Sequence, residues 1–148
     1  MRTLTTAEFL EAAIVGTLRQ VINKSKGVPD RYGFEGDAWG VHIEGACAEK
    51  LVARETGSYW IGALNQKDSG ADVGPYGVRH TPLPGGSLIL HPADEDNQTF
   101  FLVVGLAPEQ RIVGSIDGGS GKSGEFWRTD VRTPAFFVPQ SALEEWKR

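Results

Sequence analysis

The chain has 148 residues and a formal net charge of −4, and 40% of its residues are hydrophobic while 23% are charged. This composition fits a single globular domain over residues 1–148 and excludes disorder along the whole length. The single cysteine excludes a disulfide framework and a cysteine-based zinc cluster, and the mild acidity argues against a protein that coats nucleic acid by charge alone.

The N-terminal region carries no targeting or membrane signal. No stretch of the sequence reaches the ~18–20 consecutive apolar residues that a membrane helix needs. Glu8 and Glu11 interrupt the region where a signal peptide would have its apolar segment. We therefore expect a soluble cytoplasmic protein without membrane contact.

A first helix is predicted from the segment Thr5-Thr6-Ala7-Glu8, which fits a capping box. Apolar residues then recur at spacings of three and four, which predicts one apolar helix face made of Leu10, Ile14, Leu18, Val21 and Ile22. The helix should end at Gly27, Pro29 and Asp30. Residues 31–40 carry three glycines and are interpreted as a loop.

A second helix is predicted over residues 42–56, with Gly57 as its left-handed C-terminal cap. Cys47 lies inside this helix between two alanines, which favours a small buried thiol over a nucleophile.

Short β-like runs follow the second helix, at residues 59–64, 78–81, 87–91, 99–105, 111–116 and 135–138. The segments 82–86 and 94–97 are interpreted as hairpin-type connections. A second capping box at residues 141–144 predicts a short terminal helix through Trp146. The expected fold is therefore α+β, with a mixed, mostly antiparallel sheet flanked by helices.

The string Gly118-Gly119-Ser120-Gly121-Lys122-Ser123 looks like a nucleotide-binding P-loop. That motif needs a glycine five residues before Gly121, where this chain has Ile116, and it must open a helix. We therefore interpret the string as a flexible loop between strands. The acidic run at residues 94–97 lacks the glycine and the glutamate of an EF-hand, so we interpret it as a turn.

A dispersed set of polar residues could hold chemistry. Glu49 lies on the second helix, Asp72 precedes a predicted strand, and Arg79 lies on that strand. Carboxylate oxygens bind divalent metals, and a nearby cation stabilises charge on a phosphate. The structural alternative is that Glu49 is a solvated helix residue, Asp72 a turn former and Arg79 half of a sheet-face ion pair.

The order of three short motifs resembles the restriction-endonuclease-like PD-(D/E)XK superfamily, and its small phage or prophage members in particular. The motifs are G-A-x-x-E ending at Glu49, G-x-D-V-G around Asp72, and V-R-x-T around Arg79. The resemblance implies a restriction-endonuclease-like fold and phosphodiester hydrolysis with Mg²⁺ or Mn²⁺. It implies that Glu49 and Asp72 bind the metal and that Arg79 replaces the catalytic lysine. We expect such a site in the cleft between the second helix and the strand at residues 78–81, where His80 is a candidate nearby donor or water-orienting group.

One acid of the family motif is missing, because Gly77 stands two residues before Arg79. Arginine also stays protonated and cannot act as a base. Three hypotheses follow. The chain is an active metal-dependent nuclease in which Glu44 or Asp94 replaces the missing acid, and a nuclease that cuts two strands favours a homodimer. Alternatively, it is an impaired nuclease-fold protein that binds nucleic acid or a protein, or it is an unrelated α+β binding module.

Overall fold

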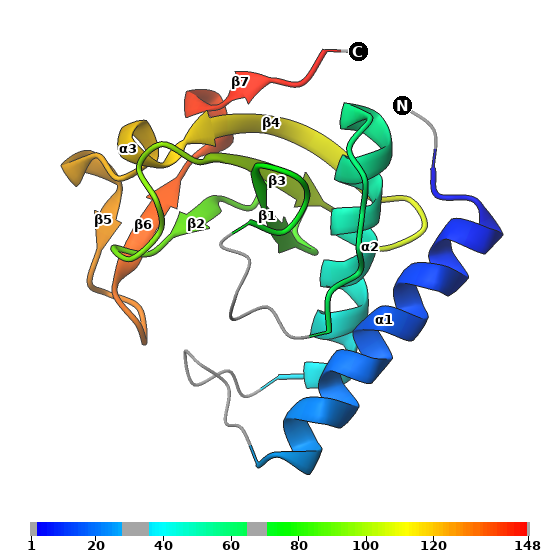
Figure 1. Ribbon diagram of the computed structural model, residues 1–148. Coiled ribbons are helices and arrows are strands. Elements are labelled where there is room, and N and C mark those ends of the chain that lie inside the picture. Colours follow the sequence, from blue (N-terminus) through cyan, green and yellow to red (C-terminus); the bar gives the residue numbers. More distant parts are fainter. Residues whose placement is uncertain (1–2, 28–35, 65–70, 148) are drawn as a thin grey trace.

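The computed structural model describes residues 3–27, 36–64 and 71–147. The fold is α+β with mixed sheets, as the sequence predicts. Its layers run from α1 to α2, then to one sheet and finally to a second, smaller sheet (Figure 1). Within the described part of the chain, no helix combines the length and the apolar character that crossing a membrane requires.

Helix α1 (Thr6–Ser25) begins with the predicted capping box. The Thr5 hydroxyl oxygen accepts from the Glu8 amide at 3.2 Å, and the Thr5 amide donates to the Glu8 carboxylate at 2.8 Å. The helix ends before Gly27, whose φ of 62° lies in the left-handed region. Both ends therefore agree with the local sequence signals.

The face of α1 that packs on α2 is not the predicted apolar face. Four of the five predicted residues are 42–60% exposed: Leu10, Ile14, Leu18 and Val21. The buried residues of α1 are Ala12, Gly16, Arg19 and Gln20. A Cβ added at Gly16 would lie 2.5 Å from the His42 carbonyl oxygen, so the two helix backbones are very close there. Only small residues fit where two helices approach this closely, so the large apolar residues of α1 lie on its outward face.

Helix α2 (Ala38–Thr56) starts at Ala38, earlier than the predicted start at His42. Asp37 forms the N-cap, and its carboxylate accepts from the Gly40 amide at 3.1 Å. The end of the predicted 31–40 loop therefore belongs to the helix, while its residues 31–35 lie outside the described residues. Gly57 caps the C-terminus with a φ of 68°, as predicted.

Cys47 has no exposed surface, as predicted for a buried thiol. Burial, together with the charge of Glu44, raises the pKa of this thiol to about 12. The reactive thiolate is therefore scarce at neutral pH.

In the described part of the chain, seven strands form two sheets. The first has the order β1-β3-β4-β7 and the second has the order β2-β6-β5. Strand β1 is parallel to β3, and the other pairs are antiparallel, which agrees with the predicted mixed, mostly antiparallel arrangement. The strands are β1 (Tyr76–Thr81), β2 (Leu88–Leu90), β3 (Thr99–Val104), β4 (Arg111–Asp117), β5 (Trp127–Arg128), β6 (Ala135–Val138) and β7 (Glu144–Glu145).

Two of the predicted connections are not hairpins. Residues 82–86 join β1 to β2, which belong to different sheets, and residues 94–97 lie between β2 and β3, which also do not pair. The predicted strand at residues 59–64 is wrong as well, because no strand is assigned there. This segment instead runs back along α2 towards its N-terminal end (Figure 1).

The predicted terminal helix is also wrong. Residues Gln140–Ala142 form a 3₁₀ turn, and β7 follows it, paired with β4. A Cβ at Gly114 of β4 would lie 2.4 Å from the Glu144 carbonyl oxygen, so the glycine allows this strand to approach. A pairing partner distant in sequence therefore overrides the local capping signal.

The two faces of the first sheet form separate cores. Along β3, Phe101 and Val103 pack towards α2, whereas Phe100, Leu102 and Val104 pack towards the second sheet. This alternation is the normal two-residue period of a strand. Any side chain of the first sheet therefore belongs to either the helix side or the second-sheet side.

Candidate functional site

Glu49, the predicted helix acid, lies in the interior between α1 and α2. Its carboxylate accepts two hydrogen bonds from the Arg19 guanidinium, Nη1 to Oε1 and Nη2 to Oε2, both at 3.0 Å. The Trp60 indole Nε1 donates a third bond, to Oε2, at 3.0 Å. The side chains of Arg19 and Glu49 are each 7% exposed, so this is a buried, bidentate ion pair.

Burial raises the pKa of the Glu49 carboxyl, because the charged form loses its hydration. The hydrogen bonds and charge of Arg19, with the bond from Trp60, oppose this rise in pKa, and the negative charge of Asp72 adds to it. Glu49 and Asp72 are therefore close enough to interact electrostatically.

Arg19 also joins a third segment to this ion pair. Its Nε donates to the carbonyl oxygen of Ala63 at 2.8 Å. One guanidinium therefore connects α1, α2 and the extended segment that follows α2. In this arrangement Glu49 is the acceptor of a structural anchor.

Asp72 lies in the turn that leads into β1. Its Oδ2 accepts from the Val78 amide at 2.8 Å, and its own amide donates to the Tyr76 carbonyl oxygen at 2.9 Å. The Arg79 Nη1 is 3.8 Å from Oδ2, so the structure brings these two predicted residues together. Asp72 thus holds the start of β1 and faces one cation.

Arg79 points to the side of the sheet that faces away from α2. Its Nη2 donates to Asp94 Oδ1 at 2.8 Å, and its Nε donates to the Ile89 carbonyl oxygen at 3.1 Å. The guanidinium lies 4.9 Å from the ring centre of Phe100, which belongs to the second-sheet core. The first sheet therefore separates Arg79 from Glu49, whereas the sequence predicted both residues in one cleft between the second helix and residues 78–81.

His80 is next to Arg79 on β1, and adjacent strand residues point to opposite faces. The His80 Nε2 lies 2.7 Å from the carbonyl oxygen of Gly105. His80 thus contacts the connection that follows β3, on the opposite face of the strand from the Arg79 guanidinium.

The position of the missing family acid is closed by the core. A Cβ at Gly77 would lie 2.4 Å from Phe100 Cδ1, and Phe100 is only 1% exposed. Of the two proposed replacements, Asp94 is paired with Arg79. Glu44 Oε2 accepts from the Ala107 amide at 2.8 Å and from Gln110 Nε2 at 2.7 Å.

These contacts test the fit of a divalent metal. The Glu49 oxygens face Arg19 and Trp60, and a metal would have to displace those donors. Within residues 3–27, 36–64 and 71–147, no three histidine, cysteine, aspartate or glutamate side chains form a group that could hold an ion. The described residues therefore do not fit the Mg²⁺ or Mn²⁺ site that the family resemblance implies.

The first four residues of the glycine-rich string form a short helix, α3 (Gly118–Gly121), where the sequence predicted a flexible loop. Asp117 caps it and accepts from the Ser120 amide at 2.9 Å, and the Gly119 amide donates to the Asp96 carbonyl oxygen at 2.9 Å. These amides already have acceptors, which agrees with the rejection of a phosphate site.

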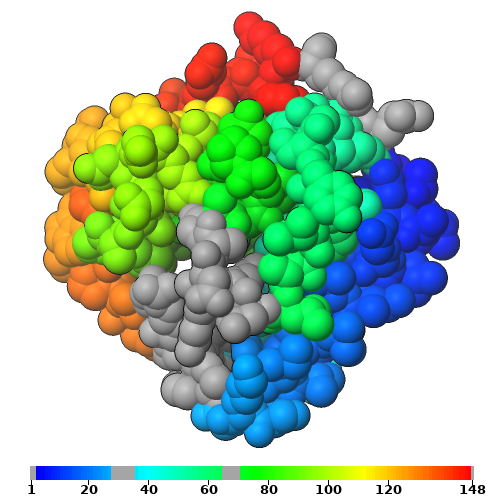
Figure 2. All heavy atoms as spheres, viewed as in Figure 1, coloured from blue at the N-terminus to red at the C-terminus, as the bar shows by residue number. Residues whose placement is uncertain are grey.

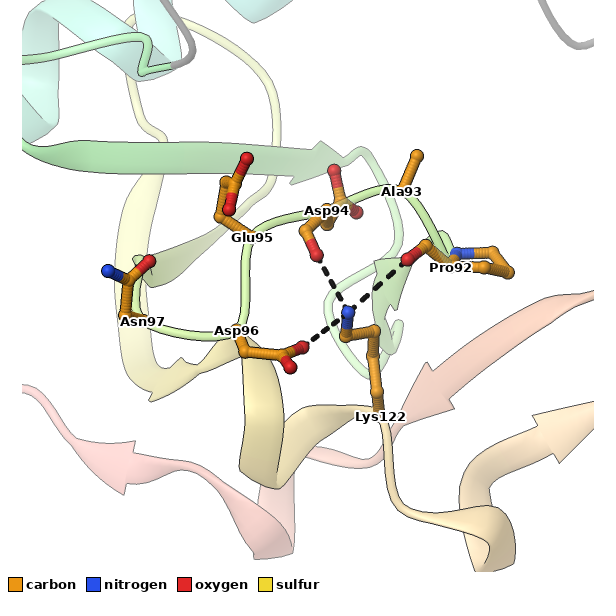
Figure 3. A pocket seen from close by; sticks show the side chains of 7 residues that line it. All are labelled: Pro92, Ala93, Asp94, Glu95, Asp96, Asn97 and Lys122. Carbon is orange, nitrogen blue, oxygen red and sulfur yellow. Dashed lines mark hydrogen bonds and ion pairs between the residues drawn. The ribbon is translucent and has the colours of Figure 1, made fainter.

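The acidic turn at residues 94–97 lines an open hollow next to α3 (Figure 3). Lys122 reaches into it, and its Nζ donates to the carbonyl oxygen of Asp94 at 2.7 Å and pairs with the Asp96 carboxylate. The Lys122 ammonium group therefore balances negative charge in this acidic turn, which has a structural role.

The partners of Glu49 were not found by sequence reasoning. Arg19 and Trp60 are eleven or more residues from Glu49, and no local motif joins them. One signal was available, because Arg19 lies three residues after Gly16 on the side of α1 that carries the small residues.

The outer side of α1 exposes several large apolar side chains to solvent. Four apolar side chains form what we call the α1 stripe, with exposed fractions of 60% for Leu10, 51% for Ile14, and 42% each for Leu18 and Val21. Figures 1 and 2 show α1 at one edge of the molecule, with α2 between it and the sheets. The stripe therefore faces outward.

Two more apolar side chains are exposed on the segment that follows α2. Tyr59 is 83% exposed and Ile61 is 66% exposed. Tyr59 lines a shallow hollow together with Glu11, and a Cβ at Gly62 would lie 3.2 Å from Val15 Cγ2. This segment therefore runs along the side of α1 that carries Glu11 and Val15. An exposed apolar patch such as the α1 stripe marks an interaction site.

Comparisons of the chain with protein-family models, with curated proteins and with solved structures gave no match.

Proposed function

We propose that this chain is an α+β binding module that binds another protein chain through the α1 stripe. The observation that carries the proposal is the outward position of four large apolar residues on one helix face: Leu10, Ile14, Leu18 and Val21. A water-exposed helix usually places polar residues there. Covering these side chains with a partner would remove their apolar surface from water, which is favourable.

The interior of the protein supports a binding role over hydrolysis. Glu49 is occupied by Arg19 and Trp60, and it helps to fix α1 against α2. A rigid helix is a good platform for binding, because less freedom is lost when the partner arrives. Glu49, which the nuclease hypothesis assigns to a metal ion, thus helps to hold α1, the helix that carries the proposed binding surface.

The chemistry of the stripe favours a protein partner over nucleic acid. Nucleic acid attracts lysine and arginine by its phosphates, whereas the centre of this face is apolar and the chain has a net charge of −4. A helical segment with its own apolar side chains would match the surface in the manner of a helix laid in a groove.

The test is a selection of binding peptides from a random helical-peptide display library, with the folded chain as the target. We expect selected peptides to bind the wild type and the L83D variant equally. We expect the I14D variant to lose at least ~10-fold in affinity, which corresponds to about 1.4 kcal/mol. Leu83 is a suitable control because it is a 65% exposed apolar residue outside α1.

Circular dichroism of both variants would first establish that the fold is retained. Peptides that bind I14D as tightly as the wild type would show that the α1 stripe is not the binding surface and would overturn the proposal. Peptides that lose affinity for L83D instead would place the binding surface elsewhere.

A further inference from the structure

We infer that the partner on the α1 stripe is a second copy of this chain, held by an antiparallel pair of α1 helices about a two-fold axis. This inference rests on the proposed function and specifies its partner. A two-fold interface uses the same patch on both copies, so the patch must be complementary to itself. The stripe meets that requirement in spacing and in charge.

The spacing of the stripe is nearly symmetric about its own middle, because its residues are four, four and three positions apart. Leu10, Ile14, Leu18 and Val21 span roughly 16 Å of helix at about 1.5 Å per residue. A two-fold axis between Ile14 and Leu18 places those two residues opposite each other in the two copies. The same axis places Leu10 within one residue of Val21 of the second copy, about 1.5 Å along the helix, so every large side chain of the stripe meets an apolar one.

The charges of α1 are also complementary to an antiparallel copy. Glu11 lies near its N-terminal end, and Lys24 and Lys26 lie near its C-terminal end, whereas Glu8 is already bound to Thr5 and Arg54. The two-fold axis brings the acidic end of one helix level with the basic end of the other. Glu11 pairs with Lys50 at 2.9 Å, yet its side chain is 57% exposed and remains accessible. Antiparallel helix dipoles add to this preference.

The size of the surface is consistent with a weak dimer. The stripe offers apolar surface on the order of several hundred Å², within the ~300–600 Å² of the largest patch on a typical monomer. A standard interface needs about 800 Å² from each partner. The polar flanks of α1 must supply the remainder, so we expect dissociation on the order of micromolar concentrations.

The experiment is sedimentation velocity of the full chain across concentrations from about 1 μM to about 1 mM. We expect a concentration-dependent dimer whose Kd rises at least ~10-fold in L10D and in V21K, because each change puts a charge opposite an apolar residue. The matched control is L83D, which changes a leucine that is 65% exposed against 60% for Leu10, and it should leave the Kd unchanged.

Mixing the two variants tests the register. In the antiparallel arrangement the position changed in L10D faces the position changed in V21K, so a 1:1 mixture should form heterodimers with a Kd near that of the wild type. A parallel pair would place each position against its own copy, and the mixture would then gain much less. A Kd near that of the wild type in the mixture supports the inference. A mixture whose Kd stays as high as that of the single variants overturns the antiparallel arrangement.

The outcomes also separate this inference from the proposed function. A chain that stays monomeric throughout, while display-selected peptides still bind the stripe, overturns the second copy and leaves the proposed function standing. A dimer that is unaffected by L10D and V21K also overturns the inference, because it must use another surface. If selected peptides ignore the stripe as well, the proposed function fails.

Discussion

Replacing Arg19 by methionine is the most informative change in the interior. Methionine has similar length and packs in place of the aliphatic stem, but it removes the two bonds to Glu49 at 3.0 Å and the bond to the Ala63 carbonyl oxygen at 2.8 Å. The Glu49 side chain is 7% exposed, so its carboxylate would remain buried without its cation. Removing one partner of such a pair costs about 3–5 kcal/mol of unfolding free energy.

This loss should depend on pH. Burial raises the pKa of Glu49 in the folded chain, and removing Arg19 takes away the main opposing influence, so the pKa rises further. A carboxyl with a raised folded pKa binds its proton more tightly when folded, so stability is lost as pH rises from the unfolded pKa through the folded pKa. The R19M variant should therefore lose less stability near pH 4.5 than at pH 7.

The assay is urea unfolding of the wild type, R19M, E49Q and R19M/E49Q at both pH values. The double variant removes both charges and keeps an amide oxygen for the Trp60 indole, so its loss at pH 7 should be smaller than the sum of the single losses by about 1–3 kcal/mol. An R128A control, at an exposed ion pair with Asp130, should leave the urea midpoint unchanged. A loss below about 1 kcal/mol for R19M at pH 7, or additive losses, would refute the anchoring role.

Three further predictions concern the helix crossing, the thiol and the predicted nuclease site. G16A should lower the unfolding free energy by about 1–3 kcal/mol, because its Cβ would lie 2.5 Å from backbone atoms of α2. The control G45A, whose Cβ would have no atom within 4 Å, should stabilise the chain by up to ~1 kcal/mol. Equal effects of the two changes in urea unfolding would contradict the close helix crossing. Cys47 should react with a thiol reagent at neutral pH only in urea, since it is buried and its pKa is about 12, and rapid labelling of the folded chain would contradict this. With Mg²⁺ or Mn²⁺, the wild type should nick supercoiled plasmid no faster than the D72N variant, which keeps an acceptor for the Val78 amide. Nicking by the wild type that is abolished in D72N would restore the nuclease hypothesis.

Local chemistry predicted much of the fold. The Thr5–Glu8 capping box, the Gly57 cap and the apolar run of β3 depend on neighbouring residues, and the structure confirms them. The start of α2 was missed because Asp37 lies in a glycine-rich stretch that reads as a loop, although an aspartate N-cap is itself a local signal.

Long-range contacts explain the remaining errors. The packed face of α1 depends on the close approach of α2 at Gly16, which a helix pattern alone does not reveal. Likewise, β7 replaced the predicted terminal helix because Gly114 gives it room beside β4. The family motifs predicted that Asp72 and Arg79 would be neighbours, but strand alternation sends Arg79 away from α2. The contacts of Arg79 with the Phe100 ring and with the Ile89 carbonyl oxygen of β2 identify that face.

The most direct test of the account is a concentration series of amide ¹H–¹⁵N NMR spectra of the wild-type chain. If the α1 stripe binds a second copy, the resonances of Leu10, Ile14, Leu18 and Val21 will shift together as concentration rises, and that of Leu83 will stay constant. Spectra that do not change with concentration, or shifts confined to residues outside α1 and its neighbouring segment, would contradict the account.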